Sequence, residues 1–206
     1  MATPSDAQAF AACVAGGGVV VFPADTVYGL ACSPEDAAAV SRLYEFKGRS
    51  EGKPSAVMFF AVEPAFAALP ELGSRTRALL ERLLPGAVTA LLPNPQGRFP
   101  LACGEDLGTL GLRVPALPDA VARLAEVDLP VLQSSANLAG GPDPRRLADV
   151  PPAIRLGADL VLDSGELPGT PSTVVDLRRF EEAGEWAVVR VGAVAEAAIA
   201  EAVANG

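Results

Sequence analysis

The sequence predicts a protein of the α/β class, called α+β in some schemes, built on a mixed β-sheet. Short uninterrupted apolar runs, such as residues 19–22 and 56–60, are typical of strands buried on both faces. Helical patterns that begin at capping residues separate these runs. In places the strands outnumber the helices between them, which favours a mixed sheet over a purely parallel one. No internal repeat, linker or shift in composition divides residues 1–206, so a single domain is expected.

The first two elements are predicted to be a helix and a buried strand. Ser5 and Gln8 have the spacing of a capping box, and the alanine-rich segment after them stops at three consecutive glycines. The strand at 19–22 follows and ends at a proline. We expect residues 23–30 to form a loop at the carboxyl end of this strand, which is where ligands tend to bind in open α/β sheets.

A second helix and a basic loop come next. Ser33 is the expected N-cap, with a proline and two acids in the first turn, and the helix runs to about Tyr44. Residues 47–54, KGRSEGKP, carry three cations in a chain whose formal net charge is -9. Glycine and proline break helix and strand alike, so we expect a loop that can wrap an anion such as a phosphate chain. The alternative is a solvated surface loop, and the spacing excludes a Walker-type phosphate loop.

The remaining elements are predicted from apolar runs and helix stop signals. Residues 93–108 form a loop rich in proline and glycine that is long enough to be functional or mobile. The segment 134–137, SSAN, follows a short strand, where small polar groups can reach a ligand. Further strands are expected at 88–92, 110–115, 130–133, 160–163, 172–176 and 186–191, and helices at 64–69, 75–83, 119–126 and 194–203.

Composition excludes several classes of function. No run approaches the roughly 20 apolar residues of a membrane helix, and the first residues lack the features of a signal peptide, so a cytoplasmic protein with no membrane partner is expected. The absence of histidine removes Ser-His and Cys-His nucleophile pairs and His-ligated metals. Cys13, Cys32 and Cys103 lack the spacing of a disulfide frame or a zinc site and are expected to be reduced. A net charge of -9 argues against broad nucleic-acid binding.

Four groups of polar residues are candidates for one ligand site. Lysine and arginine would neutralise a polyphosphate, serine and asparagine would orient it, and a lone arginine on a strand would hold a carboxylate. The groups converge if the strand ends share one edge of the sheet. Each group also has a structural alternative, namely a turn, an ion pair or a cap. The groups are Asp25, Thr26 and Tyr28; Lys47, Arg49 and Lys53; Arg113; and Ser135 and Asn137.

Several short motifs together resemble one family. PADTVYGL at residues 23–30 is close to the pattern Pro-Thr-Asp/Glu-Thr-x-Tyr-Gly-Leu, and the other motifs follow in the family's order and spacing. The chain therefore resembles the L-threonylcarbamoyladenylate synthases, whose shared domain is called YrdC or Sua5. The other matches are KGR at 47–49, PGAVT at 85–89, LRVP at 112–115, SAN at 135–137, PSTVVD at 171–176 and RVG at 190–192.

The resemblance implies a fold and a reaction. The fold would be a three-layer YrdC/RibB-like one, in which helices flank a twisted mixed sheet around a large concave pocket, without the C-terminal Sua5 domain of longer members. The reaction would make threonylcarbamoyl-AMP and pyrophosphate from L-threonine, bicarbonate or CO2, and ATP accompanied by Mg2+, with no metal ligands from the protein. The product would serve a threonylcarbamoyl-transferase complex that modifies adenosine 37 of tRNA, and a direct tRNA contact is a further implied partnership.

The resemblance also implies residue roles. The amine of threonine is itself the nucleophile toward CO2, so the protein needs only to align two anions and screen their repulsion, and no histidine base is required. By the family's pattern the catalytic residues Lys47, Arg49, Ser135 and Asn137 would hold ATP together with Arg190, with Lys53 and Thr109 nearby. Thr26, Tyr28, Arg113 and Ser172 would line the threonine side.

Three positions depart from the family's pattern. Ala24 replaces a usual threonine, Met58 stands where many members carry a histidine near the threonine, and Gln133 replaces a small residue. We therefore expect weaker or differently arranged threonine contacts, and any ATP lid would come from the chain's own loops, such as 93–108. The alternatives are a non-catalytic RNA-binding YrdC-like module and a paralogue with a different substrate. A carbamoyl-transfer module of the hydrogenase-maturation type is disfavoured, because this sequence shows neither an acylphosphatase-like domain nor zinc fingers.

Overall fold

The computed structural model describes residues 5–50 and 52–205, and in this part of the chain nine strands form one mixed sheet. The strand order is β7-β1-β2-β6-β3-β5-β4-β8-β9, in which β1 with β7, β3 with β5, and β4 with β8 are parallel and the other pairs are antiparallel. The predicted mixed sheet is therefore confirmed. The strands are β1 (Val20–Pro23), β2 (Tyr28–Cys32), β3 (Ala56–Met58), β4 (Val88–Pro93), β5 (Thr109–Arg113), β6 (Val131–Ser135), β7 (Leu160–Val161), β8 (Thr173–Asp176) and β9 (Ala187–Arg190).

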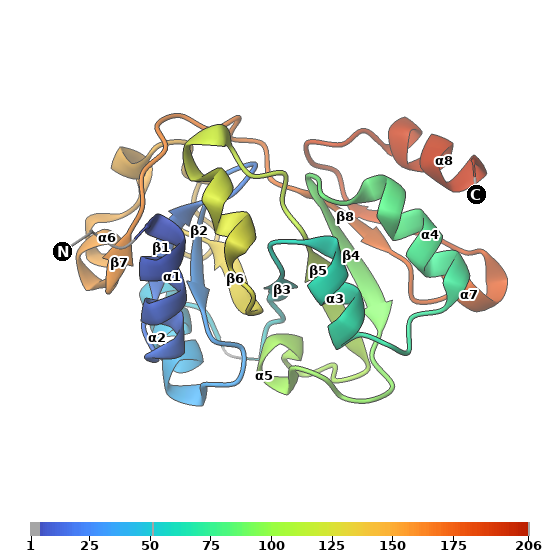
Figure 1. Ribbon diagram of the computed structural model, residues 1–206, viewed down its shortest axis with the longest axis horizontal. Coiled ribbons are helices and arrows are strands. Elements are labelled where there is room, and N and C mark those ends of the chain that lie inside the picture. The colour runs from blue at the N-terminus through green and yellow to red at the C-terminus, as the bar shows by residue number, and fades with distance from the viewer. Residues whose placement is uncertain (1–4, 51, 206) are drawn as a thin grey trace.

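Helices flank the twisted sheet, as predicted (Figure 1). Helices α1 and α2 lie at the end of the sheet that holds β1 and β2, while α4 and α8 lie at the end that holds β4 and β8. Among the described residues, no helix is long and apolar enough to cross a membrane. The α-helices are α1 (Asp6–Ala15), α2 (Ala37–Lys47), α3 (Val62–Ala68), α4 (Ser74–Leu83), α5 (Pro100–Cys103), α6 (Pro152–Gly157), α7 (Phe180–Ala183) and α8 (Glu196–Ala204), and the 3-10 helices are η1 (Asp119–Glu126) and η2 (Leu147–Asp149).

Of the two N-caps predicted near the N-terminus, one is confirmed and the other is wrong. The capping box of α1 is confirmed, because the Gln8 amide donates to Ser5 Oγ at 3.3 Å and the Ser5 amide donates to Gln8 Oε1 at 2.9 Å. The predicted cap Ser33 of the second helix is wrong, and Asp36 is the N-cap. One oxygen of Asp36 accepts the amides of residues 38 and 39 at 2.9 and 3.1 Å, so the carboxylate satisfies two free donors of the first turn.

The predicted loop 23–30 is also wrong, since its second half is strand β2. The chain turns back at residues 24–27, and Pro23 pairs with Tyr28 across an antiparallel hairpin. β2 then pairs on its other side with β6, so it is an inner strand buried on both faces. Sequence reasoning missed it because the motif was interpreted as a ligand loop, although Tyr28 to Cys32 is an apolar run.

Other boundaries shift by smaller amounts. Residues 119–126 form a 3-10 helix instead of an α-helix, with non-helical backbone angles at Val121. Helix α2 continues three residues past Tyr44 to Lys47, and Gly48 ends it in the left-handed conformation that glycine adopts without a steric penalty. Sequence reasoning also missed α5, α6, α7 and η2, whose three to six residues are too few for a periodic pattern.

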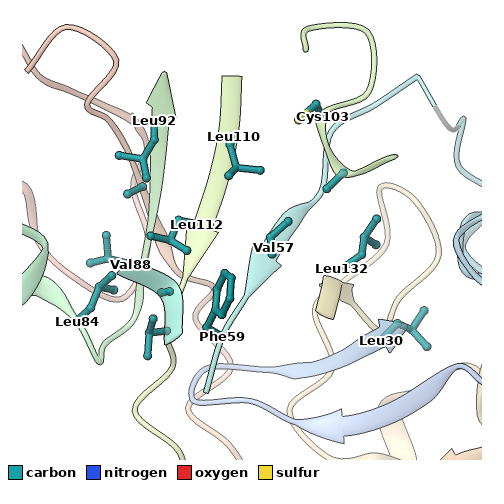
Figure 2. Close-up of a cluster of buried hydrophobic side chains, with 14 of the residues drawn as sticks. Leu30, Val57, Phe59, Leu84, Val88, Leu92, Cys103, Leu110, Leu112 and Leu132 are labelled. Carbon is teal, nitrogen blue, oxygen red and sulfur yellow. The ribbon is translucent and has the colours of Figure 1, made fainter. Parts of the chain in front are cut away.

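The main hydrophobic core lies on one face of the sheet along most of its width. Side chains alternate between the two faces of a strand, so Leu110 and Leu112 of β5 point into this core while their neighbours do not. Figure 2 shows these two leucines close to Val88 and Leu92 of β4 and to Val57 of β3. Each large apolar side chain that is fully buried here contributes roughly 1.5–3 kcal/mol.

The opposite face of the sheet is covered over only part of its width. A second cluster packs Phe10 of α1 against Phe22 and Phe60, with both ring pairs edge to face at 5.3 Å between centroids. Met58 of β3 belongs to this cluster, whereas Ala56, two residues earlier and therefore on the same face, lines a cavity. The cavity thus lies where the cover of this face stops, and it is the large concave pocket that the resemblance implies.

Candidate active site

A cavity of about 490 Å³ lies on the partly covered face of the sheet. Its floor is formed by strand residues that alternate with the core residues, including Ala56 of β3, Gly111 of β5, Leu91 of β4 and Val174 of β8. Ala56 and Gly111 are paired neighbours in the sheet. Because both side chains are small, the cavity is deepest in the middle of its floor. The cavity extends across the sheet from β6 to β9.

Lys47 is the last residue of α2 and is buried, with 3% of its surface exposed. Its Nζ donates to the carbonyl oxygens of Ser135 and Asn137, the second at 3.0 Å, and to Asn137 Oδ1 at 2.9 Å. Burial above all, and then the nearby Arg49, lower the pKa of Lys47 to about 8. The structure therefore brings Lys47 into contact with two other predicted site residues, Ser135 and Asn137, which lie 88 and 90 positions later in the sequence.

The segment after β6 is organised around the Asn137 side chain. Ser135 Oγ donates to Asn137 Oδ1 at 2.7 Å, and Asn137 Nδ2 donates to the Gly141 carbonyl at 2.7 Å. Ser135 lines the cavity, whereas Lys47 and Asn137 contact Ser135 without lining the cavity themselves. In this arrangement every donor of the lysine ammonium has a protein acceptor, so Lys47 also fixes the position of the SAN segment.

Arg49 provides the cation that lines this end of the cavity. Its Nη2 donates to the Pro54 carbonyl at 2.7 Å and its Nη1 to Ser134 Oγ at 3.4 Å, while its Nε has no partner among the described residues. Lys53 is exposed and lies outside the cavity lining. The basic loop therefore contributes Arg49 to the cavity wall, while Lys53 belongs to the exposed surface.

Arg113 lies in the floor of the cavity and is buried together with Asp25. Their ion pair is 2.6 Å long and each side chain is 5% exposed, and Arg113 Nη1 also donates to Gln133 Oε1 at 3.1 Å. Burial lowers the pKa of Arg113, and the Asp25 carboxylate opposes that shift. Asp25 Oδ2 and Arg113 Nε have no partner among the described residues. The ion pair considered for Arg113 as a structural alternative is present, and Arg113 still lines the cavity.

Ser172 and Arg190 occupy the side of the cavity formed by β8 and β9. Arg190 Nη2 donates to the Ser172 carbonyl at 2.8 Å and to its Oγ at 3.2 Å, and Ser172 Oγ shares a hydrogen bond of 2.8 Å with Thr89. All three line the cavity. In the sequence Thr89 stands out only as part of the PGAVT motif, although its position two residues before Leu91 on a strand places it on the same face.

Thr26 lies in the turn between β1 and β2, and Tyr28 is the first residue of β2. Thr26 is buried and lines the cavity, with its Oγ1 3.4 Å from Asp25 Oδ1. Tyr28 is part of the main core, and its hydroxyl donates to Asp163 Oδ1 at 2.5 Å and accepts the amide of Ser164 at 3.1 Å. Burial and the bond to Asp163 raise the pKa of Tyr28. Tyr28 therefore holds the 163–165 loop and lies outside the cavity lining.

A second group of charged residues borders the cavity near Thr109. Thr109 Oγ1 donates to Asp106 Oδ2 at 2.7 Å and accepts from Arg178 Nη1 at 3.4 Å. Asp106 and Arg178 both line the cavity and were missed by sequence reasoning, as was Asp143 at the opposite end. Arg178 lies two residues beyond the end of strand β8, and its place at the cavity depends on where β8 lies in the sheet.

Met58 and the 93–108 loop, both singled out in the sequence, have defined places in the structure. Met58, where many members of the resembled family carry a histidine, is fully buried in the second core cluster. The 93–108 loop contains helix α5 and is tied together by Asn94, whose Nδ2 donates to the carbonyls of Arg98 and Leu107 at 3.0 Å each. Cys103 of this loop is buried and lines the cavity.

The described residues include no group of three or more Asp, Glu, Cys or His side chains placed to hold a metal ion. Asp106 and Asp143 each bring one carboxylate to the cavity wall. A magnesium ion that arrives on a polyphosphate typically needs only one or two carboxylates from the protein. The donor set therefore fits an ion carried by a nucleotide and does not fit a permanently bound one.

Comparison with known proteins places this chain among related sequences. The family model Sua5_yciO_yrdC, described as "Telomere recombination", matches residues 12–192. Curated relatives called threonylcarbamoyl-AMP synthase include one from Xanthomonas campestris (strain B100), 33% identical over 177 residues that cover 84% of this chain and 94% of the relative. Two others are from Pyrococcus abyssi, 31% identical over 165 residues, and Bacillus subtilis, 33% identical over 132 residues. These alignments cover 80% and 64% of this chain but only 48% and 38% of the two relatives.

Two solved structures share the fold over nearly the whole chain. P. abyssi Sua5 complexed with L-threonine superposes with a TM-score of 0.83 and 28% identity, covering 95% of this chain and 56% of that one. E. coli YciO superposes with a TM-score of 0.78 and 25% identity, covering 96% of this chain and 95% of that one. The predicted three-layer architecture is therefore confirmed.

Proposed function

Since the chain belongs to the Sua5, YciO and YrdC family, we propose that it is a threonylcarbamoyl-AMP synthase. As a nucleotidyltransferase it would make L-threonylcarbamoyl-AMP and pyrophosphate from L-threonine, bicarbonate or CO2, and ATP. The names of the relatives and the threonine in the P. abyssi structure support this proposal. The product would pass to a threonylcarbamoyl-transferase complex for modification of adenosine 37 in tRNA.

The cation end of the cavity supplies what a triphosphate requires. Arg49 and Ser135 line the wall there, and Lys47 Nζ donates to the carbonyl of Ser135. Two cations held by hydrogen bonds in a partly desolvated site attract phosphate oxygens more strongly than solvated lysines do. The proposal assigns Lys47, Arg49, Ser135 and Asn137 to the triphosphate, with Arg190 and Thr109 farther along the cavity and Lys53 at its outer edge.

The floor around Arg113 supplies what an amino acid requires. A guanidinium pairs with a carboxylate through two parallel N–H groups, and Arg113 has an Nε–H without a partner among the described residues. Thr26 and Ser172 add hydroxyl groups to the same cavity. The proposal assigns Arg113, Thr26 and Ser172 to threonine, and gives Tyr28 an indirect role through the loop that it holds.

The reaction needs alignment and charge screening more than acid–base groups. The threonine nitrogen adds to the carbon of CO2 and loses a proton, which gives a carbamate. One carbamate oxygen then attacks the α-phosphorus, and the bond from that phosphorus to the oxygen bridging the β-phosphate breaks, which releases pyrophosphate. Cations on both anions lower their repulsion at the point of attack, and this accounts for catalysis without histidine. Mg2+ on the nucleotide would add further charge neutralisation.

One observation carries the proposal: Arg49 and Ser135 at one end and Arg113 in the floor line a single cavity, in a chain of this family. The test is pyrophosphate release from MgATP with threonine and bicarbonate added or omitted in turn. Release that requires both supports the synthase, and serine in place of threonine measures selectivity. Release that requires neither indicates a nucleotide hydrolase. No release, together with tight tRNA binding, indicates the non-catalytic RNA-binding module.

A further inference from the structure

Arg178 lines the cavity on the side of β8, whereas Lys47 contacts Ser135 at the end of β6. Arg178 follows strand β8, and its side chain is 46% exposed. Its Nε donates to both carboxylate oxygens of Asp176 at 2.9 and 3.1 Å, and its Nη2 donates to Asp176 Oδ2 at 2.5 Å. A side chain clamped at three points keeps its guanidinium plane in one orientation.

The charge around Arg178 argues against a role in binding phosphate. Asp176 neutralises the guanidinium, and Asp106 Oδ2 lies 4.0 Å from its Nη1. A polyphosphate placed here would meet two carboxylates and one arginine. The group that remains available to a ligand is the flat face of the guanidinium, which stacks on aromatic rings.

The neighbouring wall of the cavity is apolar. Three apolar side chains form it. Leu91 of β4 pairs with Asp176 in the sheet, and Val174 lies two residues before Asp176 on β8. Val189 comes from the edge strand β9. Val189 is 60% exposed although it borders the cavity. An aromatic ring between this apolar wall and the guanidinium would bury both surfaces.

We propose that Arg178 holds the adenine base of the nucleotide by stacking its guanidinium on the ring against Leu91, Val174 and Val189. This inference rests on the proposed function, because it requires a nucleotide whose triphosphate lies at the cation end. It adds a specificity residue that no motif in the sequence identified. The phosphates bind at Arg49, and the base is selected at the opposite wall.

The experiment compares the wild-type protein with Arg178→Ala, Arg178→Lys and the control Arg179→Ala. Arg179 is the next residue, is 71% exposed, pairs with Glu185 at 3.2 Å and lies outside the cavity lining. Binding is measured by calorimetry with three probes, namely MgATP, MgCTP and magnesium tripolyphosphate. Far-ultraviolet circular dichroism and thermal melting confirm that each variant is folded.

Stacking predicts that Arg178→Ala weakens MgATP binding by roughly three- to thirty-fold and lowers the preference for ATP over CTP. Tripolyphosphate binding is then unchanged, Arg178→Lys does not restore ATP affinity because an ammonium has no flat face, and Arg179→Ala behaves like wild type. Unchanged ATP affinity in Arg178→Ala overturns the assignment. An equal loss for tripolyphosphate indicates a phosphate contact, and an equal loss for ATP and CTP indicates a ribose contact; either result also overturns it.

Different results would contradict the proposed function and the assignment of Arg178 to adenine. Wild-type protein that binds neither nucleotide contradicts the proposed function, and the Arg178 assignment falls with it. Wild-type protein that binds MgATP and releases pyrophosphate, combined with an unaffected Arg178→Ala, contradicts the Arg178 assignment alone.

Discussion

Lys47 and Asn137 are joined by two hydrogen bonds from a single ammonium group, to the Asn137 carbonyl at 3.0 Å and to its Oδ1 at 2.9 Å. A helix end and a strand end that lie 90 residues apart therefore form one unit. The charge that we assign to phosphate and the segment that we assign to its orientation are held by the same contacts. Removing either residue is expected to disturb both.

We expect Lys47→Ala and Asn137→Ala each to abolish pyrophosphate release while the protein stays folded. Lys47→Ala also leaves the Ser135 and Asn137 acceptors without their donor, so the free energy of unfolding should fall by about 1–3 kcal/mol. Pyrophosphate release and urea melts measure the two effects. Lys53→Ala, an exposed position outside the cavity lining, should show a much smaller loss. A normal rate in either main variant would remove that residue from the site.

The pKa of Lys47 near 8 predicts a pH dependence of nucleotide binding. As the pH rises through about 8, the free protein loses the Lys47 charge, so ATP affinity measured without threonine should decrease. Bound phosphate stabilises the ammonium and should move the inflection of kcat to higher pH than that of kcat/KM. Lys47→Met, which cannot titrate, should bind weakly at every pH and show no inflection near 8. An inflection that persists in Lys47→Met would assign it to another group.

The same pKa predicts an opposite trend in stability. The pKa of Lys47 is lowered from an ordinary value of 10.5 to about 8, so between these values the unfolded chain binds more protons at this residue than the folded chain does. The contribution of Lys47 to the free energy of unfolding therefore rises with pH across that window. Urea melts of wild type and Lys47→Met at pH 7 and pH 10 isolate it. The difference between the two proteins should change in favour of wild type at the higher pH.

We expect Arg113→Ala to raise the threonine requirement far more than the ATP requirement. It also leaves the buried Asp25 carboxylate without its partner, which typically costs about 3–5 kcal/mol. The double variant Asp25→Ala with Arg113→Ala removes the uncompensated charge and should recover much of that stability without recovering threonine affinity. Thermal melting and separate KM values for the two substrates distinguish these effects. Equal changes in both KM values would contradict the role of Arg113.

We expect Gly111→Val to weaken ligand binding in the cavity without unfolding the protein. A Cβ built at Gly111 meets atoms of Ala56 and Leu91 at 3.5–3.8 Å, which is ordinary van der Waals contact, and β-branched residues suit strands. The added methyl groups raise the lowest part of the floor, so affinity for ATP and threonine should both fall. Gly192→Ala is the contrasting variant. Its new Cβ would lie 2.3 Å from the Pro171 carbonyl oxygen, so we expect this substitution to lower Tm. Wild-type affinity in a folded Gly111→Val would place the ligands elsewhere.

Much of the local structure followed from the sequence alone. The capping box at Ser5 and Gln8 and the buried strand near 19–22 depend on neighbouring residues, so a pattern of a few positions is enough to predict them. The α/β class and the mixed sheet follow from the order of such elements. Combined with the motifs between residues 23 and 192, these features led to the family to which the chain belongs.

The arrangement of the site was decided by the tertiary structure. The spacing of residues does not reveal that Asp25 pairs with Arg113, that Tyr28 turns into the core toward Asp163, or that Arg178 reaches the cavity. Each of these contacts depends on which strands become neighbours and on which face each side chain lies. A one-residue shift in strand register would move a side chain from the cavity to the core, and the register is set by packing over the whole sheet.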